Sequence, residues 1–451
     1  MTLRNDLISA AVLSAAFLFL LIAAESWRRL GKANPEWTRK LVHLCGGMIC
    51  LAFPWCIQSP LVVLVMAAAY SLTFAIGKRT RLLESLHGVS RKTRGSEYYP
   101  LSIFLIFLIA HNQPWLYTAS VLVLAVADAF AGLIGSRYGS MYYEVEDDHK
   151  SLEGSLVFLV LAFLAIHLPM LLMTDIPRAT CVLAALLVAV LVTGFEAISL
   201  GGADNLFVPL GVCVILSKIT SKPLTEVVYQ NLSLAGLCLC VSLLVWRVRS
   251  FNVGATIALV LFTYGAWSLG SELWALPILL GIFAYLGSWF FFPLPLEARP
   301  PLKVRLASRA LIIPLILLMA GNMLNMSALF YGPFIAALAV ILSFSLWNHL
   351  MIARPHKGPR RAIGALCTGA IAWGTVAVVP WLVSPGVPPS APAALLLVTV
   401  PAAFINDRLM GGNAASARHY AWSASRLILT FAAAGTIICL QLSGLTPQWR
   451  P

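Results

Sequence analysis

Apolar stretches of about 20 residues recur along almost the whole chain, with short polar loops between them. A stretch of this length can cross the hydrocarbon core of a bilayer as a helix, in which every backbone polar group is paired within the segment. The pattern therefore predicts an all-α, polytopic membrane helical bundle with about 16 transmembrane segments. They are expected near residues 7–26, 41–57, 60–77, 99–111, 115–136, 153–174, 179–200, 204–217, 231–246, 252–270, 272–292, 309–324, 328–350, 362–383, 391–406 and 425–443.

The composition supports the same class. Hydrophobic residues make up 60% of the 451 residues and charged residues only 11%, which excludes a soluble fold. The first apolar run is long enough to span, and no basic region with a small-residue cleavage site accompanies it, so we expect no cleavable signal peptide. The nine cysteines lie mostly in apolar segments without metal-ligand spacing, so neither a disulfide framework nor a zinc site is expected.

The net charge of +13 indicates orientation in the membrane and not nucleic-acid binding, because the basic residues fall in short loops between the apolar segments. With the N-terminus outside, most Lys and Arg residues are cytoplasmic, as the positive-inside rule requires. We therefore expect a multi-pass protein, in the plasma membrane of a bacterium, with its active site facing the cytoplasm. The cytoplasmic loops would be 27–40, 78–94, 137–152, 200–204, 247–251, 293–309, 351–361 and 407–424.

The most informative segment is VADAFAGLIGSRYG, which places Asp128 inside an apolar run. An intramembrane carboxylate is costly unless it faces protein, water or a cation, so it marks a functional site by default. Lys150 and Glu153 follow in KSLEGS, just before the next apolar run. Together, Asp128, Lys150 and Glu153 have the charges to hold a metal-bound polyphosphate. The alternative is a packing role, because small residues recur every fourth position at Ala127, Ala131, Gly135 and Gly139.

A second group of polar residues opens the segment RKLVHLCGG. Arg39 and Lys40 are followed by His43 on about the same helical face as Arg39. The two cations could equally serve as anchors to lipid headgroups. The acidic stretch YYEVEDDH, residues 142–149, is better interpreted as a solvated turn than as a metal site.

A third group lies in FEAISLGGADNLFVPL, residues 195–210. Glu196 closes one apolar segment and therefore needs a partner, for which Lys150, Arg39 or a bound cation are the candidates. Asp204 opens the next segment after a glycine pair, where an aspartate could also serve simply as a helix N-cap.

These four motifs, in this order, resemble the family of CTP-dependent lipid-alcohol kinases that includes dolichol kinase, phytol kinase and the CTP-dependent diacylglycerol kinase. The resemblance covers residues 35–245. RKLVHLCGG, ADAFAGLIGSRYG, KSLEGS and EAISLGGADNLFVPL resemble the family's ordered motifs, with Ala127 where the family usually has glycine. The resemblance implies that the site residues are Arg39, Lys40, Asp128, Gly135, Lys150, Glu153, Glu196, Asp204 and Asn205.

The resemblance implies a phosphoryl-transfer site with Mg²⁺ as cofactor and CTP as phosphoryl donor, and we assign roles from the needs of that reaction. Asp128 binds the metal, with Glu153 or Asp204 as a second carboxylate. Glu196 or His43 orients or deprotonates the alcohol, and the two stay equal candidates. The expected contacts to the nucleotide are Arg39, Lys40, Gly132, Gly135, Gly139, Lys150, Ser151, Gly154 and Asn205.

The expected partners are thus a lipid alcohol, a nucleotide and membrane lipids, without nucleic acid. We expect an isoprenoid alcohol of the polyprenol, phytol or geranylgeraniol type. A diacylglycerol kinase and a phosphatidate cytidylyltransferase are alternatives, although Asp407 and Arg408 lack the final acid of the latter's signature. A secondary transporter would also bury Asp128 and Glu196, yet it would not need the RK and KSLEGS motifs.

The sequence divides into an N-terminal anchor at 1–34, a kinase-like membrane domain at 35–249 and a second membrane domain at 250–451. The last part faintly resembles the phytyl-phosphate kinase family in residues 253–288 and 402–412, which suggests an internal duplication. Alignment of the halves puts Leu342 where Asp128 stands, so the copy would lack the metal aspartate. Alternatively, Asp407 and Arg408 with the basic segment HKGPRR form a second site, although these cations are better explained by the positive-inside rule.

Overall fold

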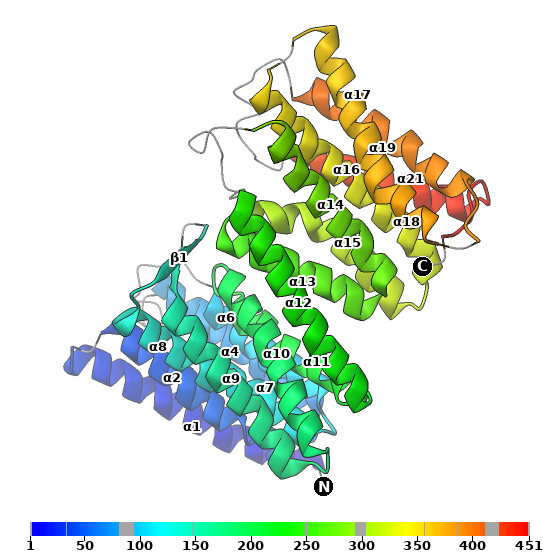
Figure 1. The fold of residues 1–451 in the computed structure, drawn as a ribbon. Coiled ribbons are helices and arrows are strands. Elements are labelled where there is room, and N and C mark those ends of the chain that lie inside the picture. The colour runs from blue at the N-terminus through cyan, green and yellow to red at the C-terminus, as the bar shows by residue number, and fades with distance from the viewer. Residues whose placement is uncertain are drawn as a thin grey trace. The chain divides into compact units, whose positions relative to one another are not determined.

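The computed structural model describes residues 2–32, 34–80, 94–146, 148–248, 251–293, 304–355, 357–384, 386–410 and 424–449. Helices account for nearly all of the regular structure in these ranges (Figure 1). The chain forms two compact units, Met1–Ala235 and Gly236–Pro451. This division falls inside α12 (Leu224–Val248), whereas the sequence places the change of domain between 249 and 250.

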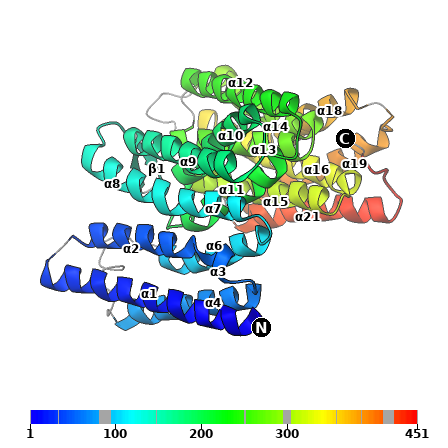
Figure 2. The same ribbon diagram turned by 90° about the horizontal axis from the view of Figure 1, so that it is seen from below.

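Unit 1 is a stack of helices on which one small hairpin is set (Figure 2). α1 packs on α2 and α4, α4 packs on α6, and α9 packs on α7, α8 and α10. The exception to the all-α prediction is the antiparallel hairpin β1–β2, which pairs Tyr143 with Lys150. The elements are α1 (Thr2–Leu30), α2 (Pro35–Cys50), α3 (Phe53–Cys56), α4 (Pro60–Thr80), α6 (Gly95–Ile109), α7 (Pro114–Leu122), η1 (Val123–Ala127), α8 (Asp128–Tyr138), β1 (Tyr142–Val145), β2 (Asp148–Ser151), α9 (Leu152–Met173), α10 (Arg178–Ile198) and α11 (Asp204–Ile219).

Local sequence signals explain where several of these helices begin. Asn34 caps α2 by accepting a hydrogen bond from the Glu36 N–H at 2.9 Å, and Pro35 takes the first position, where its missing N–H is harmless. Ser151 caps α9 in the same way through the Gly154 N–H at 3.1 Å. The chain therefore enters α2, which carries Arg39 and Lys40, and α9, which carries Glu153, at defined points.

Unit 2 is built around α16, and 83% of the most apolar window of this helix is buried. α14, α15, α17, α19 and α21 all pack against it. The elements are α13 (Val253–Leu269), α14 (Glu272–Phe291), α15 (Val304–Met323), α16 (Ser327–Ala353), α17 (Pro359–Trp373), η3 (Gly374–Val378), α18 (Val379–Leu382), α19 (Ser390–Leu409) and α21 (Ala424–Leu442). Within the described residues of this unit, the sequence pattern and the helices agree closely.

The polytopic helical class is confirmed, but the count of 16 spans is not. Among the described residues, 12 helices are long and apolar enough to cross a membrane. The other four predicted segments fall on α2, α6, α11 and α13, which have 16, 15, 16 and 17 residues. Three of these short helices belong to unit 1 and contribute to the site described next.

Candidate active site

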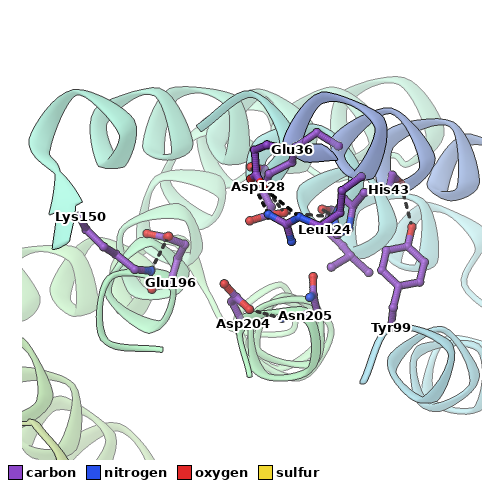
Figure 3. Close-up of polar contacts among 11 residues, drawn as sticks. Glu36, His43, Tyr99, Leu124, Asp128, Lys150, Glu196, Asp204 and Asn205 are labelled. Carbon is purple, nitrogen blue, oxygen red and sulfur yellow. Dashed lines mark hydrogen bonds and ion pairs between the residues drawn. The ribbon is translucent and has the colours of Figure 1, made fainter. Parts of the chain in front are cut away.

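Asp128, at the start of α8, is held by two side chains of α2. Lys40 Nζ lies 2.9 Å from Asp128 Oδ2 and also donates to the Asp128 backbone carbonyl at 2.9 Å. His43 Nε2 lies 3.2 Å from the same carboxylate oxygen (Figure 3). Lys40 is only 6% exposed. The structure thus joins two motifs that are 88 residues apart, RKLVHLCGG and ADAFAGLIGSRYG, into one cluster.

A π-helical turn, η1, explains how the Asp128 carboxylate and the Leu124 carbonyl both come to face α2. The Asp128 N–H bonds to the carbonyl of Val123, five residues back, and so does not bond to the carbonyl of Leu124, its partner in a regular α-helix. His43 Nε2 lies 2.7 Å from that Leu124 oxygen. Because a carbonyl can only accept, Nε2 carries the ring proton, and Nδ1 is the ring nitrogen left to accept one.

Gly132 makes the room that Lys40 needs. A Cβ at this position would lie 2.7 Å from both Cε and Nζ of Lys40, which is closer than such atoms approach in proteins. Only a glycine one turn after Asp128 lets the lysine side chain lie against α8 and reach the carboxylate. Small residues in this segment therefore serve the ion pair as well as helix packing.

Arg39, which directly precedes Lys40 in α2, forms an ion pair with a residue of the same helix. Its Nη2 lies 2.6 Å from Glu36 Oε1, and its Nε donates to Glu36 Oε2 at 3.2 Å, which is a two-point pair. The charges of Asp128 and Asp204 also act on the guanidinium. Glu36 was not singled out from the sequence, because an acid in the first turn of a helix is common for electrostatic reasons alone.

A second ion pair joins the hairpin to the end of α10. Lys150, on β2, has its Nζ 2.6 Å from Glu196 Oε1 and also donates to the Glu196 carbonyl. Burial alone would lower the pKa of Lys150, but the negative charges of Glu196 and Asp204 outweigh it, so the pKa is raised above its ordinary value. Lys150 is thus a firmly charged cation, and of the candidate partners for Glu196 it is the one that the structure pairs with it.

Asp204 and Asn205 begin α11 and lie between the two ion pairs in Figure 3, with their side chains directed toward Asp128. The N-cap of α11 is Ala203, so Asp204 does not occupy the capping position that its sequence context allows. The Asn205 side chain is buried, and its Oδ1 finds no hydrogen-bond partner among the described residues. A buried amide oxygen without a partner suits a group that arrives from outside the chain.

An amphipathic cavity opens beside this cluster. It encloses about 970 Å³ of empty space, measured with its open side, between α1, α2, α4 and α6. Its polar wall is made by Arg39, His43, Ser96 and Asn205. The remaining wall is Leu13, Phe17, Val42, Ile49, Cys50, Phe53, Val63, Met66, Ala67, Tyr70, Phe74, Gly95, Tyr99, Pro100 and Ile103.

Tyr99 is a site residue that the sequence did not reveal. Its ring meets the His43 ring edge to face at 4.9 Å between centroids, and its hydroxyl donates to the His43 carbonyl at 3.3 Å. These contacts fix the position of His43 from the cavity side. A tyrosine at the start of an apolar helix has no signal that separates it from ordinary packing, so only the structure identifies it.

Comparison with characterised proteins decides the family. The chain is 33% identical to phytol kinase of Synechocystis sp. over 210 residues, which are 46% of this chain and 89% of that protein. It is also 31% identical over 145 residues to probable phytol kinase 1, chloroplastic, of Glycine max, covering 28% of this chain and 46% of that protein. The chain belongs to the membrane lipid-alcohol kinase family. No family model matches the chain, and no solved structure does.

In this membrane kinase, several predicted nucleotide contacts have packing partners within the chain. A Cβ at Gly135 would lie 2.7 Å from Ser151 Oγ and 3.3 Å from Gly154 Cα, and one at Gly139 would lie 2.7 Å from Ser151 Cβ. These residues bring α8 close to the hairpin and to α9. Their contact with phosphate stays a prediction.

The three predicted metal ligands of the kinase are not gathered into one cluster. Glu153 accepts hydrogen bonds from the N–H groups of Ser140 at 2.9 Å and Met141 at 3.2 Å, and so holds the turn after α8. Among the described residues, no three His, Cys, Asp or Glu side chains come close enough to bind a metal on their own. Binding of Mg²⁺ by Asp128 with Asp204 stays a prediction, in which substrate phosphates would supply further ligands, as is usual for this ion.

Proposed function

We propose that this protein transfers the γ-phosphoryl group of CTP to the hydroxyl of an isoprenoid alcohol of the phytol, geranylgeraniol or polyprenol type. The single observation that carries the proposal is the amphipathic cavity of unit 1, whose polar wall includes His43 and Asn205 beside Asp128. A long apolar tail with one terminal hydroxyl matches such a cavity. The relationship to phytol kinases supports the same chemistry.

The positions of His43 and Glu196 support His43 as the base. Glu196 is bound by Lys150, whereas His43 lines the cavity and has its Nε2–H committed to Leu124 and Asp128. Nδ1 of His43 would therefore take the proton of the alcohol while the alcohol oxygen bonds to the γ-phosphorus. The bond between that phosphorus and the β-phosphate oxygen breaks, and CDP leaves. Asp128 orients the imidazole through the same Nε2.

Three buried or half-buried cations surround the place for the phosphates. Lys40, Arg39 and Lys150 are each held by a carboxylate, so their charges are in position before a nucleotide binds. Phosphoryl transfer depends mostly on positioning and on neutralising phosphate charge. Mg²⁺ held by Asp128, Asp204 and Asn205 would add to that neutralisation. CTP as the donor follows from the motif resemblance, and we place this site at the cytoplasmic face of a bacterial plasma membrane.

The test is phosphoryl transfer by the purified full-length protein in detergent, with γ-labelled CTP, Mg²⁺ and a panel of phytol, geranylgeraniol, long polyprenol and diacylglycerol. We expect label in an isoprenoid alcohol. In Asp128→Asn we expect a loss on the order of a thousandfold, because a charge that positions both Lys40 and His43 is removed.

The matched control is Asp6→Asn. Asp6 is another buried carboxylate of unit 1, but it accepts hydrogen bonds from the N–H groups of Gln58 and Ser59 at 3.1 and 2.8 Å, away from the cluster. This variant should keep its activity within about threefold, since one neutral hydrogen bond remains possible. Absence of label in every lipid with CTP, ATP and GTP would refute the kinase proposal.

A further inference from the structure

The cavity of unit 1 is long, and its polar and apolar ends lie far apart. Along α2 its wall extends from Arg39 to Cys50, and along α4 it extends from Phe74 to Val63. At about 1.5 Å of helix per residue, each stretch covers roughly 16 Å. Half of the roughly 30 Å hydrocarbon core is about 15 Å, so the cavity is about as long as one leaflet of a membrane is thick.

Phe53 lines the end of the cavity that lies farthest from the polar wall. It is the first residue of α3, just beyond the end of α2, and it is only 5% exposed. Its carbonyl accepts a hydrogen bond from the Ile57 N–H at 2.9 Å. On its other side, the buried Tyr117 of α7 donates its hydroxyl to the Cys50 carbonyl at 3.0 Å. The backbone is thus held on both sides of Phe53, which makes this ring a fixed part of the wall.

Helix α1 forms a side of the same cavity. Leu13 and Phe17 line it, although the sequence predicts only an anchor for residues 1–34. The Phe17 ring meets the Tyr70 ring of α4 edge to face, with 4.8 Å between centroids. A Cβ at Gly46 would lie 2.7 Å from Cε2 of Phe17, so α1 packs directly on α2. Protein side chains therefore bound the cavity along its length on this side as well.

We propose that this cavity measures the tail of the alcohol and that Phe53 sets the upper limit of its length. The proposal rests on the proposed function, because the hydroxyl is placed at His43 and the tail begins there. Each methylene buried between His43 and Phe53 adds to affinity. The tails of phytol and geranylgeraniol are of about the length of the cavity. A much longer tail has to displace part of the wall or remain outside it, which lowers its affinity.

The experiment maps where the tail ends, and it needs no turnover. The full-length protein in detergent, without nucleotide, is irradiated with hexadecanol that carries a photoreactive diazirine at the end of its tail. We expect labelling of the wall around Phe53, at Cys50 and Val63. Hexadecanol with the diazirine beside its hydroxyl should instead label the wall around His43 and Tyr99.

Unlabelled alcohols of increasing length measure the limit by competition. The series is farnesol, geranylgeraniol, geranylfarnesol and solanesol. In the wild type we expect competition to strengthen at least about tenfold from farnesol to geranylgeraniol, because more apolar surface is buried. Solanesol should compete at least about tenfold less well than geranylgeraniol.

Two substitutions change the length of the cavity in opposite directions. Phe53→Ala removes the ring at its far end, so geranylfarnesol should gain at least about tenfold relative to geranylgeraniol. Ala67→Leu fills the middle of the cavity, so geranylgeraniol should weaken at least about tenfold relative to farnesol. The matched control is Phe158→Ala, which truncates another buried phenylalanine of unit 1 that is not part of the cavity wall. It should leave the ranking of the four alcohols unchanged.

The outcomes separate this proposal from the kinase proposal. Tail-end labels that avoid the wall around Phe53, solanesol competing as well as geranylgeraniol, or an unchanged ranking in Phe53→Ala would each overturn the length limit. If Phe53→Ala does not fold, Ala67→Leu decides in its place. The expected labels and rankings without phosphoryl transfer to any alcohol would refute the kinase alone, and transfer without a length limit would do the reverse.

Discussion

Lys40 is the residue on which the arrangement of the active site depends most. It touches both the carboxylate and the backbone carbonyl of Asp128, and it occupies the space that a side chain at position 132 would need. A lysine buried to this extent must keep its carboxylate partner, because an uncompensated charge would be costly. The position of Lys40 therefore ties α2 to α8 and sets the position of Asp128 at the same time.

Gly132→Ala tests this dependence. The new Cβ meets only the flexible end of Lys40, so the lysine moves away and the fold persists. Because the gain of about 1 kcal/mol in helix propensity is smaller than the roughly 3 kcal/mol cost of separating a buried ion pair, we expect lower thermal stability. Phosphoryl transfer should fall by about tenfold to a hundredfold, as the Lys40–Asp128 pair is lost.

Gly265→Ala, on α13, serves as the control for that substitution, since a Cβ there meets nothing within 4 Å. It should change neither activity nor stability beyond the gain in helix propensity. Full activity in Gly132→Ala would show that the Lys40–Asp128 contact has no part in the reaction.

Lys150→Met leaves Glu196 buried without its cation. We expect a loss of about 3 kcal/mol in the free energy of unfolding, measured by denaturation in detergent, and loss of activity. Lys150→Met with Glu196→Gln should recover most of the stability but not the activity. Recovery of both would mean that the pair is only structural.

The pH dependence of the same pair follows from the raised pKa of Lys150. A raised pKa in the folded state means that the stabilisation is fully present below the ordinary value of 10.5 and is lost only as the pH rises through the higher, folded value. The stability difference between wild type and Lys150→Met should therefore not shrink between about pH 6 and 9. A difference that shrinks within that range would show that Lys150 is not held as described.

At the same scale, the sequence identified the important charges, but of their partners only Lys150, for Glu196, was among its candidates. Asp128, Lys150 and Glu196 stand out because charges are rare in apolar segments, and that cost is visible in one chain. The pairing of Asp128 with Lys40 and His43 depends on how α2 packs against α8, which no local pattern contains. The space beside Gly132 and the tautomer of His43 are likewise consequences of tertiary contact.

Among the elements, the π-helical turn η1 has the most specific role. It shifts the helical ladder by one residue, so that the Leu124 carbonyl is left for His43 and Asp128 follows at once. Such turns are the product of one extra residue in a helix and often occur at functional sites. The apolar run through residues 123–127 gives no indication of it, because a π turn and an α turn have the same composition.

Deletion of Val126 tests η1 directly. Removing one residue should restore a regular α-helix, turn the preceding residues by about 100° relative to Asp128, and return the Leu124 carbonyl to the ladder. We expect a loss of activity of about a thousandfold with membrane insertion preserved. Deletion of Thr375 in η3 controls for the general effect of shortening a span, and both variants should be extracted in detergent as folded protein. Activity near wild type after the Val126 deletion would rule out a role for the turn.

Element lengths also explain why the predicted number of spans is not confirmed. Hydropathy finds every apolar run, but it does not distinguish a helix that crosses the membrane from one that stops short. The runs at 41–57, 99–111 and 204–217 all became helices, each of 15 or 16 residues. Their polar first turns carry site residues, which is the physical reason that their apolar parts are short.

For the molecule as a whole, the orientation in the membrane is the property that charge predicts best. Ser140 follows α8 and Gln58 follows α3, at loops that the predicted topology assigns to opposite sides of the membrane. We expect a cysteine placed at Gln58 to react with an impermeant maleimide in intact cells. A cysteine at Ser140 should react only after permeabilisation, measured against the labelling of the parent protein. The reverse result would invert the topology and move the active site to the outer face.

The three short helices of unit 1 have a consequence for how two unlike substrates meet. At 1.5 Å per residue, 15 or 16 residues span about 22 to 24 Å, less than the roughly 30 Å hydrocarbon core. By length alone, none of the helices α2, α6 and α11 covers the full thickness of the hydrocarbon core. Under the proposed function, the polar first turns of these helices would let a nucleotide meet a lipid hydroxyl inside the level of the membrane surface, so the alcohol would not need to be lifted out of the bilayer to react.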